Sequence, residues 1–570
     1  MTDSVTTKPD APTNWAMIAL LVAVAIVPPT LMWLWWLDAP KGGQVGLAHM
    51  FYWLMPITCA FSAVCFVWRW RARESSAAAR MRVWWPGIVL AVVATALVFV
   101  LSPPQMRVQF DETSLVGVSQ NMHLQRMAVM TTGALPDSPG PLLLENTVDK
   151  RPTLFAFLVS AVHDVTGYRV ANAFVVNGML LALGLFVLFA AARSRLSLLG
   201  ALSAPLLILS VPLTVVVATS AGFELLATVL LLATTVAALS FVDKPSDGRF
   251  AALVGTAVLL AHARYESVLA VAMIGVLVLL MVRGRYRCNI RGAALLAVCP
   301  TLLVPLFMLL QHAQDANFTP EAGGQRLVAF EHLTSHTPKF LAAWFGGGVT
   351  SALPGWLAIV AAVLWLGRLL RGKASRADCF AIVPLMLTVV VLAWFYGDVD
   401  EPTALRLFLP LAWASLLPLL AAPVLSRARH GGALLLVAAV VLCATRLPFV
   451  ATGTAFPELR IATLTRSLDS IVDRLPGDRA TTLWVGVPAQ HLIIKGHAAL
   501  SVRSFMQRIA TVRGMMRRGE VQKVYLIETP IDRAMRPAFG APRDILAQAP
   551  SKVVERVGGD MPITVHQLGQ

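Results

Sequence analysis

The residues that could do chemistry in this sequence are charged side chains set within or beside long apolar stretches. They are Asp111, Glu112, Lys150, Arg151, Glu224, Arg264, Glu266 and Arg406. A carboxylate can deprotonate a hydroxyl group or hold a divalent cation, and paired cations can clamp a phosphate. An ionisable residue at membrane depth costs about 2.5–3.5 kcal/mol to insert, so such residues usually face a cavity or each other.

Each of these sites also has a purely structural interpretation. Asp111 and Glu112 could form a solvated turn or a helix N-terminus, where acidic residues are favoured. Lys150 with Arg151, and Arg406 by itself, could be anchors that extend to the lipid headgroups. Arg264 with Glu266 could be a structural ion pair, and Glu224, at the expected outer mouth of a span, has the same two interpretations.

The composition predicts an α-helical polytopic membrane protein. The chain has 570 residues, 57% of them hydrophobic and 14% charged, with a mean hydropathy of +0.69. Its apolar runs have the length of about 18 or more residues that a spanning helix needs. We expect about 13 spans, at 15–37, 47–68, 83–102, 170–192, 197–217, 222–242, 250–263, 264–282, 292–311, 351–370, 378–396, 405–425 and 431–450. The stretch 250–282 is ambiguous, because it is too long for one helix and short for two.

The basic residues predict the orientation. The net charge is +16, and its arginines cluster between alternate spans, for example at 69–82 and 283–291. This pattern is typical of cytoplasmic loops and not of nucleic-acid binding. It places the N-terminus inside, segments 102–167 and 312–348 outside, and everything after Val450 outside. We therefore expect a bacterial inner-membrane protein with a retained N-terminal anchor.

Three parts are expected in the chain: residues 1–82 as an N-terminal pair of spans, 83–450 as the membrane body, and 451–570 as a small extracytoplasmic α/β domain. Strands are expected at 481–487, 523–528, 553–556 and 563–567, with a helix around 502–518. The six cysteines all fall in spans or beside short inner loops, and their spacing predicts no disulfide framework and no zinc site.

The inner loops argue against an ATP-driven pump and against a transferase that uses a cytosolic nucleotide sugar. The longest, about 69–82, is too short for a nucleotide-binding domain, and the sequence has no Walker or Rossmann fingerprint. Any chemistry then belongs outside, where a donor must arrive on a membrane lipid.

Taken in order, the motifs resemble the GT-C superfamily of membrane glycosyltransferases, in the branch of protein O-mannosyltransferases and aminoarabinose transferases. The likeness covers about residues 83–425. It consists of Asp111-Glu112, then Lys150-Arg151-Pro152 entering an apolar helix that Gly167 ends, then Ser220 with Glu224, Arg264 with Glu266, and Arg406-Leu407-Phe408-Leu409-Pro410. Arg151 stands where the family often has proline, and Leu407 where an aromatic residue is common.

The resemblance implies an inverting transferase that moves a sugar from a polyprenyl phosphate to a hydroxyl of an envelope glycan, lipid or protein. Asp111, with Glu112 beside it, would be the base or would hold a divalent cation such as Mg²⁺ or Mn²⁺. Lys150, Arg151, Arg264, Glu266, Glu224 and Arg406 would meet the lipid phosphate. The alternatives are a ligase or polymerase that uses a lipid-linked oligosaccharide, a transporter or flippase, and a noncatalytic scaffold.

Overall fold

The computed structural model describes most of the chain, with gaps. The described residues are 43–71, 77–138, 140–282, 285–286, 295, 298–305, 329–345, 352–372, 376–394, 399, 402–414, 431–451, 460–530, 540–558 and 562–569. The expected span at 15–37 lies outside these residues, as do most of the span at 292–311 and the second half of that at 405–425. Between 298 and 305 the structure has one short 3-10 helix, η1 (Cys299–Leu303).

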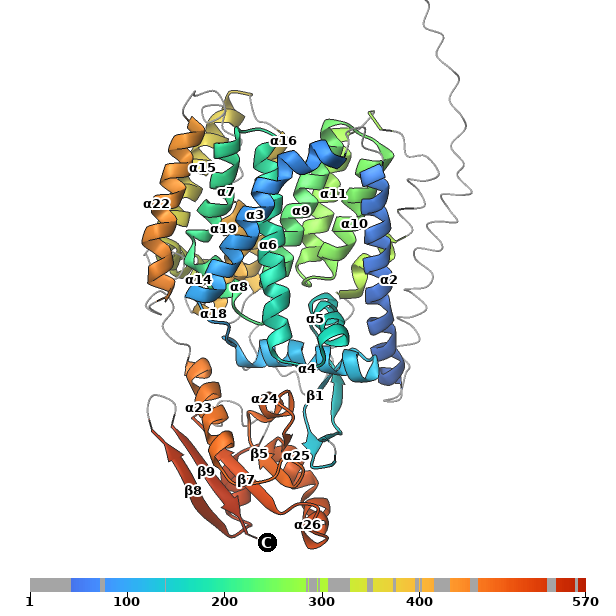
Figure 1. Cartoon of the computed structure of the whole chain (residues 1–570), viewed down its shortest axis with the longest axis vertical. Helices are drawn as coiled ribbons and strands as arrows, with labels where there is room; N and C mark the ends of the chain where they lie inside the picture. Colours follow the sequence, from blue (N-terminus) through green and yellow to red (C-terminus); the bar gives the residue numbers. More distant parts are fainter. Residues whose placement is uncertain are drawn as a thin grey trace, which may run out of the picture.

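Long apolar helices form a bundle in the upper part of the molecule (Figure 1). Among the described residues, α2 (Gly43–Arg71), α3 (Ala77–Leu101), α6 (Ala171–Arg193) and α9 (Glu224–Asp243) are long and apolar enough to cross a membrane. Helices α7 (Leu198–Leu209) and α8 (Pro212–Ala218) pass the same test as a pair, bent by 74°. Pro212 starts α8, where its missing N–H costs no helical hydrogen bond.

Shorter helices complete the bundle. The ambiguous stretch 250–282 forms two helices, α10 (Asp247–Ala261) and α11 (Ser267–Val282), and the break between them carries Arg264 and Glu266. The second half of the bundle contains α14 (Phe330–Phe345), α15 (Ala352–Leu370), α16 (Arg376–Phe380), α17 (Ile382–Trp394), α18 (Pro402–Leu405), the 3-10 helix η2 (Arg406–Phe408), α19 (Leu409–Ala414) and α22 (Gly431–Ala451).

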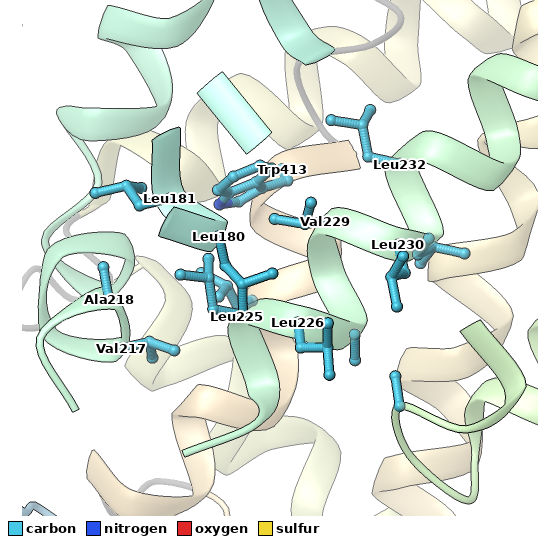
Figure 2. Close-up of a cluster of buried hydrophobic side chains, with 14 of the residues drawn as sticks. Leu180, Leu181, Val217, Ala218, Leu225, Leu226, Val229, Leu230, Leu232 and Trp413 are labelled. Carbon is cyan, nitrogen blue, oxygen red and sulfur yellow. The ribbon is translucent and has the colours of Figure 1, made fainter. Parts of the chain in front are cut away.

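A tryptophan fixes α19 in the core of the bundle. Trp413 lies among Leu181, Val229 and their neighbours from α6 and α9 (Figure 2). A Cβ atom added at Gly184 would lie 2.7 Å from the Trp413 ring, so only glycine allows this approach. The indole Nε1 donates to Thr214 Oγ1 at 3.2 Å. Because η2 runs directly into α19, this packing also fixes the turn that carries Arg406.

A helix that the hydropathy pattern does not predict lies across one end of the bundle. It is α4 (Gln109–Gln125), and Figure 1 shows it between the spanning helices and the C-terminal part of the chain. Nearly every residue from 112 to 122 is buried. Two nested antiparallel pairs follow, β1 (Val129–Thr131) with β4 (Asn146–Val148) and β2 (Ala134–Leu135) with β3 (Leu142–Leu143). The expected apolar helix is α5 (Leu154–Thr166), and Gly167 ends it with φ +80°.

The C-terminal region, residues 460–569, contains a five-stranded sheet in the order β6-β5-β7-β9-β8. Its strands are β5 (Thr482–Val485), β6 (Ala498–Leu500), β7 (Lys523–Glu528), β8 (Ser551–Val557) and β9 (Ile563–Leu568). The pairs β6-β5 and β5-β7 are parallel, and β7-β9 and β9-β8 are antiparallel. The expected strands are all present, and β6 is an addition. The helices are α23 (Arg460–Arg474), α24 (Ala489–Ile493), α25 (Val502–Gln507), α26 (Ile509–Arg517) and α28 (Pro542–Leu546).

The C-terminal region packs against the segment between α4 and α5. Ala134 and Leu135 are buried among apolar side chains of the sheet. Glu145 accepts a hydrogen bond from Ser504 Oγ at 2.7 Å and forms an ion pair with Arg508 at 3.1 Å. Tyr168 donates to the carbonyl of Ile494 at 2.6 Å. The C-terminal region therefore helps to hold in place the segment that carries Lys150 and Arg151.

Candidate functional site

Asp111 lies between two arginines that come from distant parts of the chain. Arg151 donates to Asp111 Oδ1, and Arg406 donates to Asp111 Oδ2. Arg151 also donates to Asp149 Oδ1 at 2.7 Å. Burial raises the pKa of Asp111, but the two guanidinium groups outweigh this effect and hold that pKa well below its usual range. The carboxylate is therefore ionised at every physiological pH.

The contacts continue from Arg406 to the break between α10 and α11. Arg406 Nη1 lies 2.9 Å from Glu224 Oε1, an ion pair without hydrogen-bond alignment. The same Glu224 oxygen accepts from Arg264 Nη1 at 3.3 Å, and Arg264 pairs with Glu266 through Nε. The Arg264 guanidinium also lies 4.6 Å from the centre of the Phe223 ring. We call the chain Asp149–Arg151–Asp111–Arg406–Glu224–Arg264–Glu266 the ion network.

The local structure explains how these side chains meet. Asp111 lies in the first turn of α4, Glu224 begins α9, and Arg264 follows the end of α10. Arg406 begins η2, and the Phe408 ring packs 4.4 Å from the Phe340 ring of α14. The ends of several helices therefore place polar residues at the level where α4 crosses the bundle.

Glu112 is turned away from the ion network towards the backbone. It is 1% exposed and accepts from the backbone N–H groups of Arg107 at 3.0 Å, Val108 at 3.3 Å and Ala221 at 3.3 Å. Burial raises the pKa of Glu112 to about 7. Glu112 ties the start of α4 to the segment before α9, which fixes Asp111 one residue earlier.

A narrow cavity of about 30 Å³ adjoins the ion network. Glu224, Arg264, Glu266 and Arg406 line its polar side, and its walls are mainly apolar side chains of α9, α17 and α19. The space suits about two water molecules, so a phosphate would enter only as side chains move. Within the described residues, Glu266 Oε2 and Arg406 Nε are buried without a hydrogen-bond partner.

The donor set around Asp111 does not favour a resident metal ion. Both Asp111 oxygens accept from arginines. In the part of the chain that the structure describes, no three His, Cys, Asp or Glu residues are grouped as metal ligands. A divalent cation at Asp111 would need a second source of oxygen ligands, such as a phosphate.

The structure brings most of the predicted site residues together, and their roles stay predictions. Asp111, Arg151, Glu224, Arg264, Glu266 and Arg406 meet in the ion network. Lys150 is half-buried at the same loop end, but the neighbouring Arg151 is the cation that pairs with Asp111. Sequence reasoning missed Asp149, which is 4% exposed in its side chain. The signal available for it was an acidic residue two positions before Arg151, at the end of β4.

Comparisons with known proteins show which known structures the chain resembles. No protein-family model and no curated protein sequence matches the chain. Among solved structures, ArnT from Cupriavidus metallidurans in the apo state is similar, with a TM-score of 0.54 and 14% sequence identity. That match covers 86% of this chain and 98% of ArnT. The same protein bound to undecaprenyl phosphate matches with a TM-score of 0.50 and 16% identity, over 84% and 97% of the two chains.

The likeness spans nearly all of ArnT at low identity, so it concerns the fold. It agrees with the resemblance that the motifs carry between residues 83 and 425. The chain therefore shares the fold of ArnT over most of its length.

Proposed function

We propose that the protein transfers a sugar from a polyprenyl phosphate to a hydroxyl group of an envelope glycan, lipid or protein, at the extracytoplasmic face of a bacterial inner membrane. The observation that supports this function best is the pairing of Asp111 with Arg151 and Arg406 beside a mainly apolar cavity. A carboxylate can accept the proton of an acceptor hydroxyl, and buried cations can bind a phosphate. The GT-C fold and the ArnT structure with undecaprenyl phosphate are consistent with such a donor.

The ion network explains how the donor could prepare the base. A carboxylate bound by two arginines is a weak base, because its pKa lies far below the working pH. A donor phosphate that binds Arg151, Arg406 and Arg264 competes with Asp111 and Glu224 for the same guanidinium groups. As these contacts weaken, the pKa of Asp111 rises towards neutrality, and its freed oxygen faces the acceptor.

Bond changes in the proposed reaction balance without a further reactant. The acceptor oxygen attacks the anomeric carbon as the bond from that carbon to the phosphate oxygen breaks, which inverts the configuration. Asp111 takes the hydroxyl proton, and the charge on the departing polyprenyl phosphate is stabilised by the arginines. Lys150 would add a further cation at the phosphate. A divalent cation, if bound, would be held by Asp111 and would help to stabilise the charge of the phosphate.

The test is transfer of a labelled sugar from a synthetic polyprenyl-phosphate donor by purified full-length protein in nanodiscs. Loss of the product in Asp111→Asn, with the folded protein retained, would support the proposal. A transporter or flippase would instead move the lipid donor between leaflets and form no covalent product. An enzyme that accepts only lipid-linked oligosaccharides would identify the ligase or polymerase alternative.

A further inference from the structure

A buried asparagine of α6 holds the segment that leads into α9. We call this segment, residues 219–223, the α8–α9 linker. Asn177 is fully buried, and its Nδ2 donates to the carbonyl of Ser220 at 2.7 Å and to that of Gly222 at 2.9 Å. The –NH2 group of an amide has two donors, so one side chain satisfies both carbonyls. Because buried carbonyls need donors, this contact fixes the break between the two helices.

The opposite side of the α8–α9 linker is tied to the start of α4. Glu112 accepts from the N–H of Ala221 at 3.3 Å, and Asp111, the residue before Glu112, pairs with Arg406. Glu224, the first residue after the linker, pairs with the same arginine. One short segment therefore helps to place both carboxylates that hold Arg406.

Gly222 leaves the space in which the Glu224 carboxylate lies. A Cβ atom added at Gly222 would overlap with Glu224 Oε2. The φ angle of Gly222 lies outside the left-handed region, so alanine fits the backbone and only the carboxylate has to move. The other oxygen of that carboxylate, Oε1, lies between Arg264 and Arg406. A side chain at position 222 would therefore shift the group that holds both arginines.

We propose that Asn177 and Gly222 are positioning residues of the ion network. Asn177 fixes the α8–α9 linker, and Gly222 lets the Glu224 carboxylate lie where it holds Arg264 and Arg406 together. The consequence for a donor phosphate rests on the proposed function, whereas the placement of Glu224 does not.

Displacement of the Glu224 carboxylate would separate the two arginines. Arg406 would keep Asp111, and Arg264 would keep Glu266. These partners belong to different segments, since Asp111 lies in α4 and Glu266 follows α10. A phosphate that bridges both guanidinium groups would lose at least one charge-assisted hydrogen bond as they separate. Its binding would weaken by about tenfold or more.

The first experiment measures the donor KM of full-length protein in nanodiscs, with a matched control for each variant. Gly222→Ala should raise the donor KM by about tenfold or more. Gly275→Ala, in α11, is its control and should leave KM unchanged, because an added Cβ there meets nothing within 4 Å. Asn177→Leu should also raise the donor KM. Its control is Asn172→Leu on the same helix: Asn172 is buried too, but it holds the turn between α5 and α6 by donating to the carbonyl of Gly167 at 3.0 Å. Both asparagine variants should lose stability, and only Asn177→Leu should change KM.

The second experiment needs no turnover. It measures the melting temperature for Gly222→Ala alone and combined with substitutions of Glu224. Gly222→Ala should lower the melting temperature of the wild-type protein and of Glu224→Gln, because glutamine is as long as glutamate. In Glu224→Ala the added Cβ meets no carboxylate, so Gly222→Ala should cause no further loss. If Glu224→Ala does not fold, Glu224→Asp takes its place and should reduce the loss, because its carboxylate ends one methylene earlier.

Three results would overturn the proposal. The first is a donor KM of Gly222→Ala equal to that of Gly275→Ala. The second is an undiminished loss of melting temperature from Gly222→Ala when Glu224 is shortened. The third is an unchanged donor KM in folded Asn177→Leu, which would mean that Asn177 only satisfies the two carbonyls. If the wild-type protein transfers no sugar, the proposed function fails, and the melting temperatures decide by themselves whether Gly222 positions Glu224.

Discussion

Replacing Asp111 by asparagine tests the site most directly, and the structure changes the expected size of its effects. A solvated loop residue would accept asparagine at a cost of about 1 kcal/mol or less. Asp111 instead neutralises two largely buried arginines. Breaking a buried ion pair costs about 3–5 kcal/mol. Arg151 keeps Asp149 and Arg406 keeps Glu224, so we expect the lower end of that range.

The catalytic effect must be separated from this loss of stability. Losing a general base lowers the rate by about 10²–10⁴-fold, because an amide does not accept a proton near neutral pH. Asp149→Asn is the matched control: Asp149 also pairs with Arg151, and its side chain is 4% exposed against 27% for Asp111. It should destabilise the protein at least as much while it keeps the base. We expect its activity to stay within about tenfold of wild type.

The assay is single-turnover transfer from a polyprenyl-phosphate sugar, with a thermal transition recorded for each variant. Glu112→Gln completes the series and should be milder than Asp111→Asn, because Glu112 faces backbone N–H groups. The catalytic assignment is refuted if Asp111→Asn retains activity within threefold of wild type. It is also refuted if Asp111→Asn and Asp149→Asn lose equal activity, since the loss would then follow from the shared arginine.

Four further predictions concern the donor, the metal, pH and topology. Lys150→Ala and Arg264→Ala should each raise the donor KM by about 10–150-fold, the equivalent of one lost charge-assisted contact; wild-type donor kinetics in both folded variants would leave these cations as anchors. If transfer requires a divalent cation at Asp111, EDTA should abolish transfer and added Mg²⁺ or Mn²⁺ should restore it. Full activity in EDTA excludes a required cation. The pKa of His497 is lowered from 6.5 to about 4, so the unfolded chain binds the extra proton between these values. The stability that comes from neutral His497 should therefore be fully present above pH 6.5 and fall towards pH 4, by at most about 1.4 kcal/mol per pH unit. In His497→Gln the melting temperature should depend less on pH across this range. An unchanged pH dependence of the melting temperature would contradict the lowered pKa of His497. A single cysteine at the exposed Ser551 should react with an impermeant thiol reagent in intact spheroplasts while one at Ser75 does not, and the opposite pattern would invert the orientation.

Membrane class and most helix positions could be predicted from the sequence, because they depend on local properties. A continuous run of apolar residues long enough to cross a bilayer forms a helix, since only a helix satisfies the backbone hydrogen bonds of such a segment from within itself. The strands β5, β7, β8 and β9 were likewise visible as short β-branched or apolar runs. The division into domains and the orientation in the membrane also depend on local sequence properties, and they remain predictions.

The candidate residues were also visible, since charges near apolar runs are costly and so stand out. Their partners were not. Asp111 and Arg406 are 295 residues apart in the chain, and no local pattern indicates that they meet. The adjacent acids Asp111 and Glu112 look equivalent in sequence, yet one faces arginines and the other faces backbone N–H groups. That difference follows from where the first turn of α4 is placed.

Helix α4 and strand β6 show why tertiary structure decided the rest. An amphipathic stripe appears when one face of a helix meets water, but α4 is buried between the bundle and the C-terminal region on opposite faces. Strand β6 has only the residues Ala498–Leu500 and becomes a strand by pairing with β5. Sequence alone determined what must enter the membrane and which charges are out of place there. Only the packing of distant segments decided which charges pair, because those contacts depend on residues far apart in the chain.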